Sequence, residues 1–248
     1  MYKNIVHHCI DFVNPKKVFT AQDFKKCAEK AIEDILKKGK LPIICGGTGF
    51  YIDVALGNIK IPEAPPDWKL RRKLERKSAE ELFKMLKKLN PERAKDIDSK
   101  NKRRLIRAIE IANSKNKECA RTDLAQIAQI ARSVLAIGIS RPPKVLKKRI
   151  EKRLLKQLKQ GLIEEVKNLR YKKKLSWKRL DELGLEYRWT SYFLQKKIPD
   201  EELVLKLTTE IWRYAKRQRL WFNRNKEIHW VKNEKEAKNL VSKFLKSR

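Results

Sequence analysis

Glycine and threonine lie together in one short stretch, Gly46-Gly47-Thr48-Gly49. The apolar run at residues 41–45 before it predicts a buried strand. Glycines at the carboxyl end of a strand let the backbone turn sharply and leave N–H groups free for an anion. The Thr48 hydroxyl is a further donor at the edge where α/β sheets bind ligands. The stretch predicts a phosphate subsite, and the alternative is a tight turn without a ligand.

Three arginines crowd one stretch near the middle of the chain, Arg103, Arg104 and Arg107. The pattern there predicts a helix over 100–113, on which Arg103 and Arg107 share a face. These side chains are suited to the phosphates of an RNA, and a solvated helix face is the alternative.

A second basic cluster lies near the carboxyl end, where Lys216-Arg217-Gln218 is followed by Trp221-Phe222. Basic and aromatic side chains interleaved in this way suit RNA, because cations meet phosphates and rings stack on bases. We expect Lys216 and Arg217 to face RNA and Trp221 to lie in the core. Both aromatic residues could instead be core anchors of a long helix.

The charge of the whole chain points to a polyanion. The sequence holds 62 Lys and Arg against 30 Asp and Glu, a net charge of +32. Nucleic acid is the expected partner of such a surface, and a lysine-rich solvated surface is the alternative. Runs such as Lys172-Lys173-Lys174 fit that alternative. No apolar run approaches the roughly 20 residues that span a bilayer, so no membrane partner is expected.

Cysteine and histidine usage argues against metal centres and disulfides. The chain has four cysteines, none in a C-x-x-C pair, and three histidines with no carboxylate motif beside them. We therefore expect the three histidines to have structural roles, and we expect none of the side chains to bind a metal ion. Free thiols and the lack of a signal peptide at Met1 predict a cytoplasmic protein.

Hydrophobic periodicity and capping residues set the expected elements. Thr20 and Gly39 bound a helix over 21–38, as an N-cap and a stop. Further helices are expected from 50 to about 56, and at 68–76, 78–89, 100–113, 144–159, 162–171, 186–195, 200–222 and 234–246. Strands are expected at 41–45, 133–139 and 228–231, with an extended segment at 6–12. This alternation predicts a parallel α/β sheet, and prolines at 62–66 mark the start of an all-helical insertion. So few strong strands suggest that the sequence begins partway through a domain.

Several segments carry a resemblance. They are His7-His8-Cys9-Ile10-Asp11, the stretch 19–24, Gly46-Gly47-Thr48-Gly49-Phe50-Tyr51, Asn101 with 103–110, 149–153 with 161–166, Tyr187-Arg188, and 214–218 with Trp221-Phe222 and 228–230. In this order they resemble the motifs of the tRNA dimethylallyltransferase (tRNA isopentenyltransferase) family, which include H-H-L-I-D, G-G-T-G-L-Y and Y-A-K-R-Q. The resemblance covers nearly the whole chain.

The resemblance implies a fold and a reaction. The fold would be α/β, with a P-loop NTPase-like parallel sheet core at 1–59 and 131–248 and an all-helical tRNA-binding insertion at 60–130. The reaction would be transfer of a dimethylallyl group from dimethylallyl diphosphate to N6 of the adenosine 3′ of the anticodon in tRNA. Thr48 and Arg153 would be the catalytic residues, and Gly46, Gly47, Thr48 and Arg153 would bind the diphosphate, since a guanidinium matches phosphate bidentately.

The resemblance also implies partners. The anticodon stem-loop would contact a set of basic and polar residues: Arg103, Arg104, Arg107, Tyr187, Arg188, Lys216, Arg217 and Gln218. Mg²⁺ would be held mainly through the diphosphate and a P-loop hydroxyl, and the protein would act as a monomer.

Two motifs of the family are missing from the 248 residues, and two further positions differ from the residue that the family usually has there. The sequence contains neither the G-P-T-A-S-G-K-S/T P-loop nor the D-S-x-Q-x-Y segment with the aspartate base. Glu186 stands where the family has glycine, and Asn223 where arginine often follows. We expect an N-terminally incomplete core with little transfer activity of its own. A non-catalytic RNA-binding remnant of the family is the alternative function. A relative of small-molecule kinases is a third possibility, but no ATP-binding motif supports it.

Overall fold

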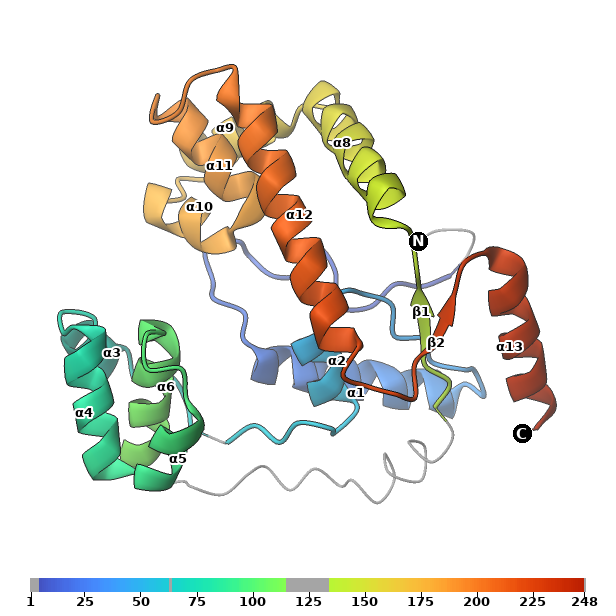
Figure 1. The fold of residues 1–248 in the computed structure, drawn as a ribbon, viewed down its shortest axis with the longest axis horizontal. Helices are drawn as coiled ribbons and strands as arrows, with labels where there is room; N and C mark the ends of the chain where they lie inside the picture. Colours follow the sequence, from blue (N-terminus) through green and yellow to red (C-terminus); the bar gives the residue numbers. More distant parts are fainter. Residues whose placement is uncertain (1–4, 63, 115–133, 248) are drawn as a thin grey trace. The chain divides into compact units, whose positions relative to one another are not determined.

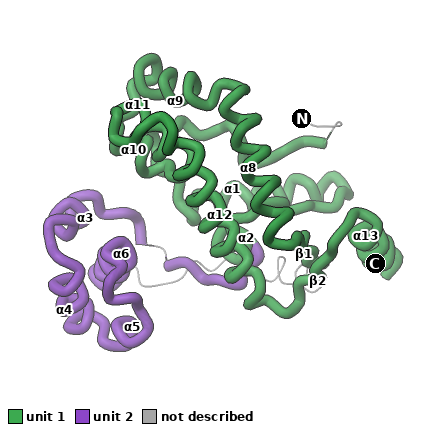
Figure 2. Tube along the Cα trace, turned by 45° about the horizontal axis from the view of Figure 1, so that its top comes forward, with its two compact units in different colours: residues 1–55, 133–248 green, residues 56–132 purple. Residues whose placement is uncertain are grey.

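The computed structural model describes residues 5–62, 64–114 and 134–247, and these divide into two compact units (Figures 1 and 2). Unit 1 consists of Met1–Ala55 and Ser133–Arg248, and unit 2 of Leu56–Arg132. The segment 60–130, for which the sequence predicts a helical insertion, lies inside unit 2.

Unit 2 is a bundle of helices around an apolar core. Its described helices are α3 (Trp68–Leu74), α4 (Ala79–Leu89), α5 (Pro91–Asp96) and α6 (Lys102–Asn113). Asp67, Ser78, Asn90 and Asn101 cap their amino ends with side-chain oxygens. The core joins side chains such as Leu82, Leu86, Leu105 and Ile109, which are fully buried.

Unit 1 is organised around a long helix. Helix α12 (Glu202–Phe222) packs with α8 (Pro143–Lys159), α11 (Leu185–Leu194) and α2 (Gly49–Ala55). Its amino-terminal half joins the core of α9 (Leu162–Tyr171) and α10 (Trp177–Leu183) through Leu203 and Leu207. Its other half reaches α2, which packs on α1 (Ala21–Lys37) (Figure 1). Helix α12 thus connects the helical core of this unit to the glycine-rich loop.

The described sheet has two parallel strands, β1 (Ile137–Ile139) and β2 (His229–Val231), and α13 (Glu234–Lys246) follows β2. Gly138 is opposite Trp230, and a side chain at Gly138 would overlap that indole ring. The strand expected at 41–45 is wrong: the segment is not a strand, and Ile43 is 79% exposed. A strand exists only by pairing, and no described strand pairs with this segment.

The helices follow the predicted pattern closely. Thr20 forms a capping box with Asp23 at the start of α1, and Gly39 adopts a left-handed conformation just beyond its end. Helices α5 and α10, of six and seven residues, are additional to the predicted elements. No described helix is both long and apolar enough to cross a membrane.

Candidate active site

One face of α12 lies against the glycine-rich loop. The Gln218 side-chain amide donates to the carbonyl oxygen of Gly47 at 2.8 Å. The hydroxyls of Thr48 and Tyr214 lie 3.5 Å apart. The Trp221 indole N–H donates to the Asp53 carboxylate at 2.7 Å. Tyr214, Gln218 and Trp221 are spaced four and three residues apart, so they share one helix face.

This close approach explains two of the glycines. A side chain at Gly47 would overlap the Gln218 amide, and one at Gly49 would overlap the Trp221 ring. Gly46 differs, because open space surrounds the position of its missing side chain. Glycine is therefore needed at 49 for packing against α12, whereas a side chain at 47 would displace the flexible end of Gln218.

The loop offers its polar groups to solvent. Thr48 and Gly46 are exposed, whereas Gly49 is buried under Trp221. The Thr48 carbonyl accepts from the N–H groups of Tyr51 and Ile52 and so begins α2, leaving its hydroxyl at the exposed side near Tyr214. A hydroxyl held in this way can donate to a phosphate oxygen.

Arg153 is exposed on α8, and no hydrogen bond or ion pair in the described parts of the chain links it to the loop. Helix α12 packs against both α8 and α2, so all three elements belong to one packed set within unit 1. The role of Arg153 in diphosphate binding stays a prediction.

The predicted RNA contacts of α12 separate into two kinds. Lys216 and Arg217 are exposed, with their cations over the rings of Trp212 and Tyr214 at 5.4 and 5.8 Å. Gln218 is half-buried and donates to Gly47, so it holds the loop, and its role as a tRNA contact stays a prediction. Trp221 is half-buried rather than fully in the core.

Tyr187 and Arg188 both have partners inside unit 1. The Tyr187 hydroxyl donates to Glu165 at 2.7 Å, and Arg188 donates to the Asp181 carboxylate and carbonyl at 2.8–3.1 Å. Burial and the Glu165 contact raise the pKa of Tyr187 to about 12. A cavity of about 440 Å³ beside Tyr187 is lined by aromatic and acidic side chains, including Phe12. These contacts hold α11 against α9 and α10.

In unit 2 the predicted arginines differ in their surroundings. Arg103 and Arg104 are exposed at the amino end of α6. Arg107 donates to the carboxylate of Glu110 at 2.6 Å, and Arg71 binds the same carboxylate through two hydrogen bonds of 2.7 and 2.8 Å. Arg107 is thus a structural partner of Glu110, which the sequence did not single out.

Glu110 is the centre of this network. Its side chain is 2% exposed, and the Asp67 N–H donates to it at 2.7 Å. Burial alone raises the pKa of Glu110, but the hydrogen bonds from Arg71, Arg107 and Asp67 outweigh burial and lower it. The carboxylate is therefore held ionised and ties α3 to α6.

A magnesium site made by protein side chains is not present in the described ranges. No group of three His, Cys, Asp or Glu residues there could hold a metal ion. At the loop the exposed oxygen donor is the Thr48 hydroxyl, and Asp53 already accepts from Trp221. These residues do not form the oxygen cage that Mg²⁺ requires.

The comparisons with known proteins decide the family. The model of the IPP transferase family matches residues 1–225. The chain belongs to the IPP transferase family. A tRNA dimethylallyltransferase 2 of Treponema denticola is 39% identical over 238 residues, covering 93% of this chain and 78% of the relative. A tRNA dimethylallyltransferase 1 of Geotalea uraniireducens is 34% identical over 248 residues, covering 97% of this chain and 80% of the relative.

Solved structures of IPP transferases resemble this chain as well. A tRNA delta(2)-isopentenylpyrophosphate transferase of Staphylococcus epidermidis aligns with a TM-score of 0.62 at 30% identity, over 96% of this chain and 80% of that one. A tRNA isopentenylpyrophosphate transferase of Bacillus halodurans aligns with a TM-score of 0.66 at 26% identity, over 98% and 80%. The helix-rich fold with a small parallel sheet is therefore that of this family.

Proposed function

We propose that this chain serves the transfer of a dimethylallyl group from dimethylallyl diphosphate to N6 of the adenosine 3′ of the anticodon in tRNA. Its relatives are tRNA dimethylallyltransferases by name. The observation that carries the proposal is the loop 46–49, which the Tyr214, Gln218 and Trp221 face of α12 holds while Gly46 and Thr48 stay exposed. The P-loop-like character of the core and the tRNA-binding role of 60–130 belong to this proposal.

In the reaction, N6 of adenine attacks the allylic carbon, the carbon–oxygen bond breaks, and diphosphate leaves with the bonding electrons. The Thr48 hydroxyl donates to the diphosphate, and Arg153 neutralises its developing charge. A base must take the N6 proton, and no described residue is assigned that role. Arg103, Arg104, Lys216 and Arg217 hold the RNA backbone while the base is extruded.

The assignment of Thr48 and Arg153 is tested by binding of inorganic diphosphate and of unmodified tRNA. Removing a charged partner of a phosphate costs about 1.5–3 kcal/mol, or roughly ten- to a hundredfold in affinity. We expect Arg153→Ala and Thr48→Val to weaken diphosphate binding, the first by this amount, with tRNA affinity unchanged. Arg213→Ala is the matched control, because Arg213 is already paired with Glu210 on α12. Weakened tRNA binding with intact diphosphate binding would move Arg153 to the RNA surface.

An RNA-binding remnant is the second candidate, because the 248 residues contain no Gly-Lys-Ser or Gly-Lys-Thr sequence. The polypeptide is incubated with unmodified tRNA and dimethylallyl diphosphate, and the nucleosides are measured by mass spectrometry. We expect transfer by these 248 residues to be several powers of ten slower than by a relative that has the Gly-Lys-Ser/Thr sequence, because phosphate-binding N–H groups and a general base each contribute large factors. Binding with no transfer at all favours the remnant, and turnover equal to the relative's contradicts the expected loss.

A further inference from the structure

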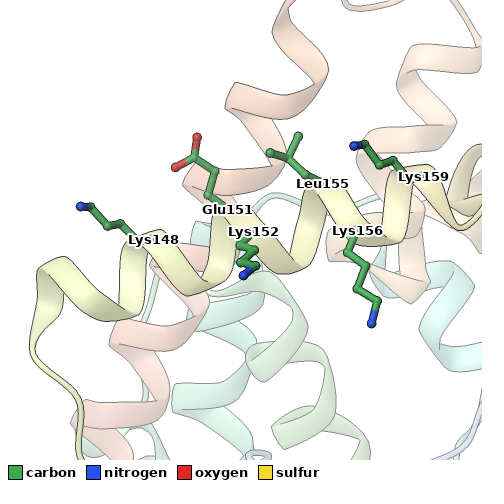
Figure 3. Close-up of a pocket in the computed structure, with 6 residues that line it drawn as sticks. All are labelled: Lys148, Glu151, Lys152, Leu155, Lys156 and Lys159. Atoms are coloured by element: carbon green, nitrogen blue, oxygen red, sulfur yellow. The ribbon is translucent and has the colours of Figure 1, made fainter.

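We infer that the outer face of α8 is a separate binding surface for the phosphate backbone of RNA, an inference that rests on the proposed function. The α8 stripe is defined as Lys148, Lys152, Lys156 and Lys159. These residues line an open cavity of about 490 Å³ on unit 1, together with Glu151 and Leu155 (Figure 3). Figure 3 shows the four lysines extending from the helix along its length.

The stripe lies opposite the packed face of the helix. Ile150 and Leu154 are buried, and α8 packs there against α12 and α9. At 100° per residue the four lysines point to the other side, and all four are exposed. The buried face positions the stripe rigidly, while the ammonium groups stay in solvent.

The cations of α8 greatly outnumber the carboxylates of their own helix. The helix carries one acidic residue, Glu151, against these basic residues: Lys144, Lys147, Lys148, Arg149, Lys152, Arg153, Lys156 and Lys159. Helices α9, α12 and α13 each contain an intrahelical ion pair, whereas no ion pair of the described residues involves α8. Lys148, Lys152 and Lys156 repeat at i, i+4 and i+8, an arrangement in which like charges repel. A polyanion laid along the stripe relieves this repulsion.

The chemistry of the stripe favours RNA over a membrane surface. A helix that binds an interface exposes a continuous apolar face, whereas Ile150 and Leu154 of α8 are buried. Leu155 is exposed within the stripe, but a single leucine among four lysines is not a continuous apolar face. Lysine is a compact point charge that binds phosphate without reading bases. The stripe therefore fits the backbone of a long RNA outside the residues proposed to hold the reacting groups.

The test compares two variants with the same loss of charge. One changes the α8 stripe, K148Q/K152Q/K156Q/K159Q, and the control changes four exposed lysines of α13, K235Q/K238Q/K243Q/K246Q. Binding of an unmodified tRNA is measured between low and moderate salt. Each phosphate contact contributes about 0.7–0.9 to the slope of log K against log salt. We expect the stripe variant to lose roughly three units of slope and the control less than one.

Further arms separate the possible failures. Arginine at the same four positions keeps the charge and should keep the wild-type slope, and circular dichroism checks that each variant is folded. Equal losses in the two glutamine variants overturn the α8 inference but leave the proposed function intact. A stripe variant that loses only binding to anionic lipid vesicles also overturns it. If the wild-type chain binds no tRNA, the proposed function itself fails.

Discussion

At the scale of single residues, the site is explained by side chains that meet across long separations in the chain. Gln218 and Gly47 are joined by a hydrogen bond across 171 positions, and Trp221 and Asp53 across 168. The sequence marks the glycine-rich loop and the cluster at 214–222 separately. It does not reveal that they touch, because local patterns specify faces and caps but not which faces pair. The hydrogen bond of Gln218 to the loop was not expected for this reason, and its assignment to RNA stays a prediction.

The three glycines of the loop give a graded prediction. Gly49→Ala would meet the Trp221 ring and should lower the free energy of unfolding by about 1–3 kcal/mol, as in overpacked cores. Gly47→Ala would meet the end of a flexible glutamine, so its smaller effect should be relieved by Gln218→Ala. Gly46→Ala has open space and serves as the control. Urea unfolding measures the free energy of unfolding of all four variants. An equal loss for Gly46→Ala and Gly49→Ala would contradict the packing of α12 on the loop.

Glu110 gives a prediction about pH. Its folded pKa is lowered, so its ionised form stabilises unit 2 above the ordinary glutamate pKa of about 4.3. This stabilisation is lost as pH falls through the folded pKa. We expect Glu110→Gln to cost about 2–3 kcal/mol at neutral pH, below the loss for a fully buried pair because Arg71 and Arg107 are partly exposed. Hydrogen exchange of the α3 and α6 amides measures the change within unit 2.

The control for Glu110 is Glu92→Gln on α5. Glu92 pairs with Lys95, but both side chains are well exposed, so its loss should be small at every pH. The difference in protection between the two variants should shrink as the solution is acidified. A difference that stays constant down to pH 3 would mean that the charge of Glu110 is not what stabilises the unit.

At the scale of elements, most helices were predictable, and of the expected strands the one at 228–231 is confirmed as β2 (His229–Val231). Caps and periodicity located α1, α9 and α13 to within one residue at each end, because a helix satisfies its hydrogen bonds within its own sequence. The segment 41–45 has the composition of a strand but no described partner. The strand expected at 133–139 is described as β1 at Ile137–Ile139, and residue 133 lies outside the described residues.

The two apolar segments therefore leave large side chains in solvent. Ile43 is 79% exposed and Ile139 is 71% exposed, and Leu41 and Ile44 are also exposed. Grouped apolar exposure of this kind binds hydrophobic dyes. We expect Ile43→Lys with Ile139→Lys to lower the fluorescence of bound anilinonaphthalene sulfonate without lowering the melting temperature. Leu205→Lys, at an isolated residue of α12 that is 65% exposed, is the control.

At the scale of the whole molecule, the charge of +32 is a property of composition, but its use depends on where the cations are held. In unit 1 several lysines pair with carboxylates, as Lys167 does with Glu164. In unit 2 Arg107 and Arg71 are committed to Glu110. Net charge alone therefore overestimates the number of cations that remain for phosphate.

The last prediction separates placement from net charge. Two double variants are compared: the arginine variant R103Q/R104Q and the lysine variant K172Q/K173Q. Each removes two exposed cations, so the net charge of both falls from +32 to +30. If the start of α6 contacts tRNA, the arginine variant should lose roughly two units of the salt slope, since each phosphate contact contributes about one. The lysine variant should stay close to the wild type, because that run is interpreted as solvated surface. Titrations of unmodified tRNA at several salt concentrations measure both. Equal slopes in the two variants would mean that the arginines act only through the overall charge, and the prediction for α6 would be wrong.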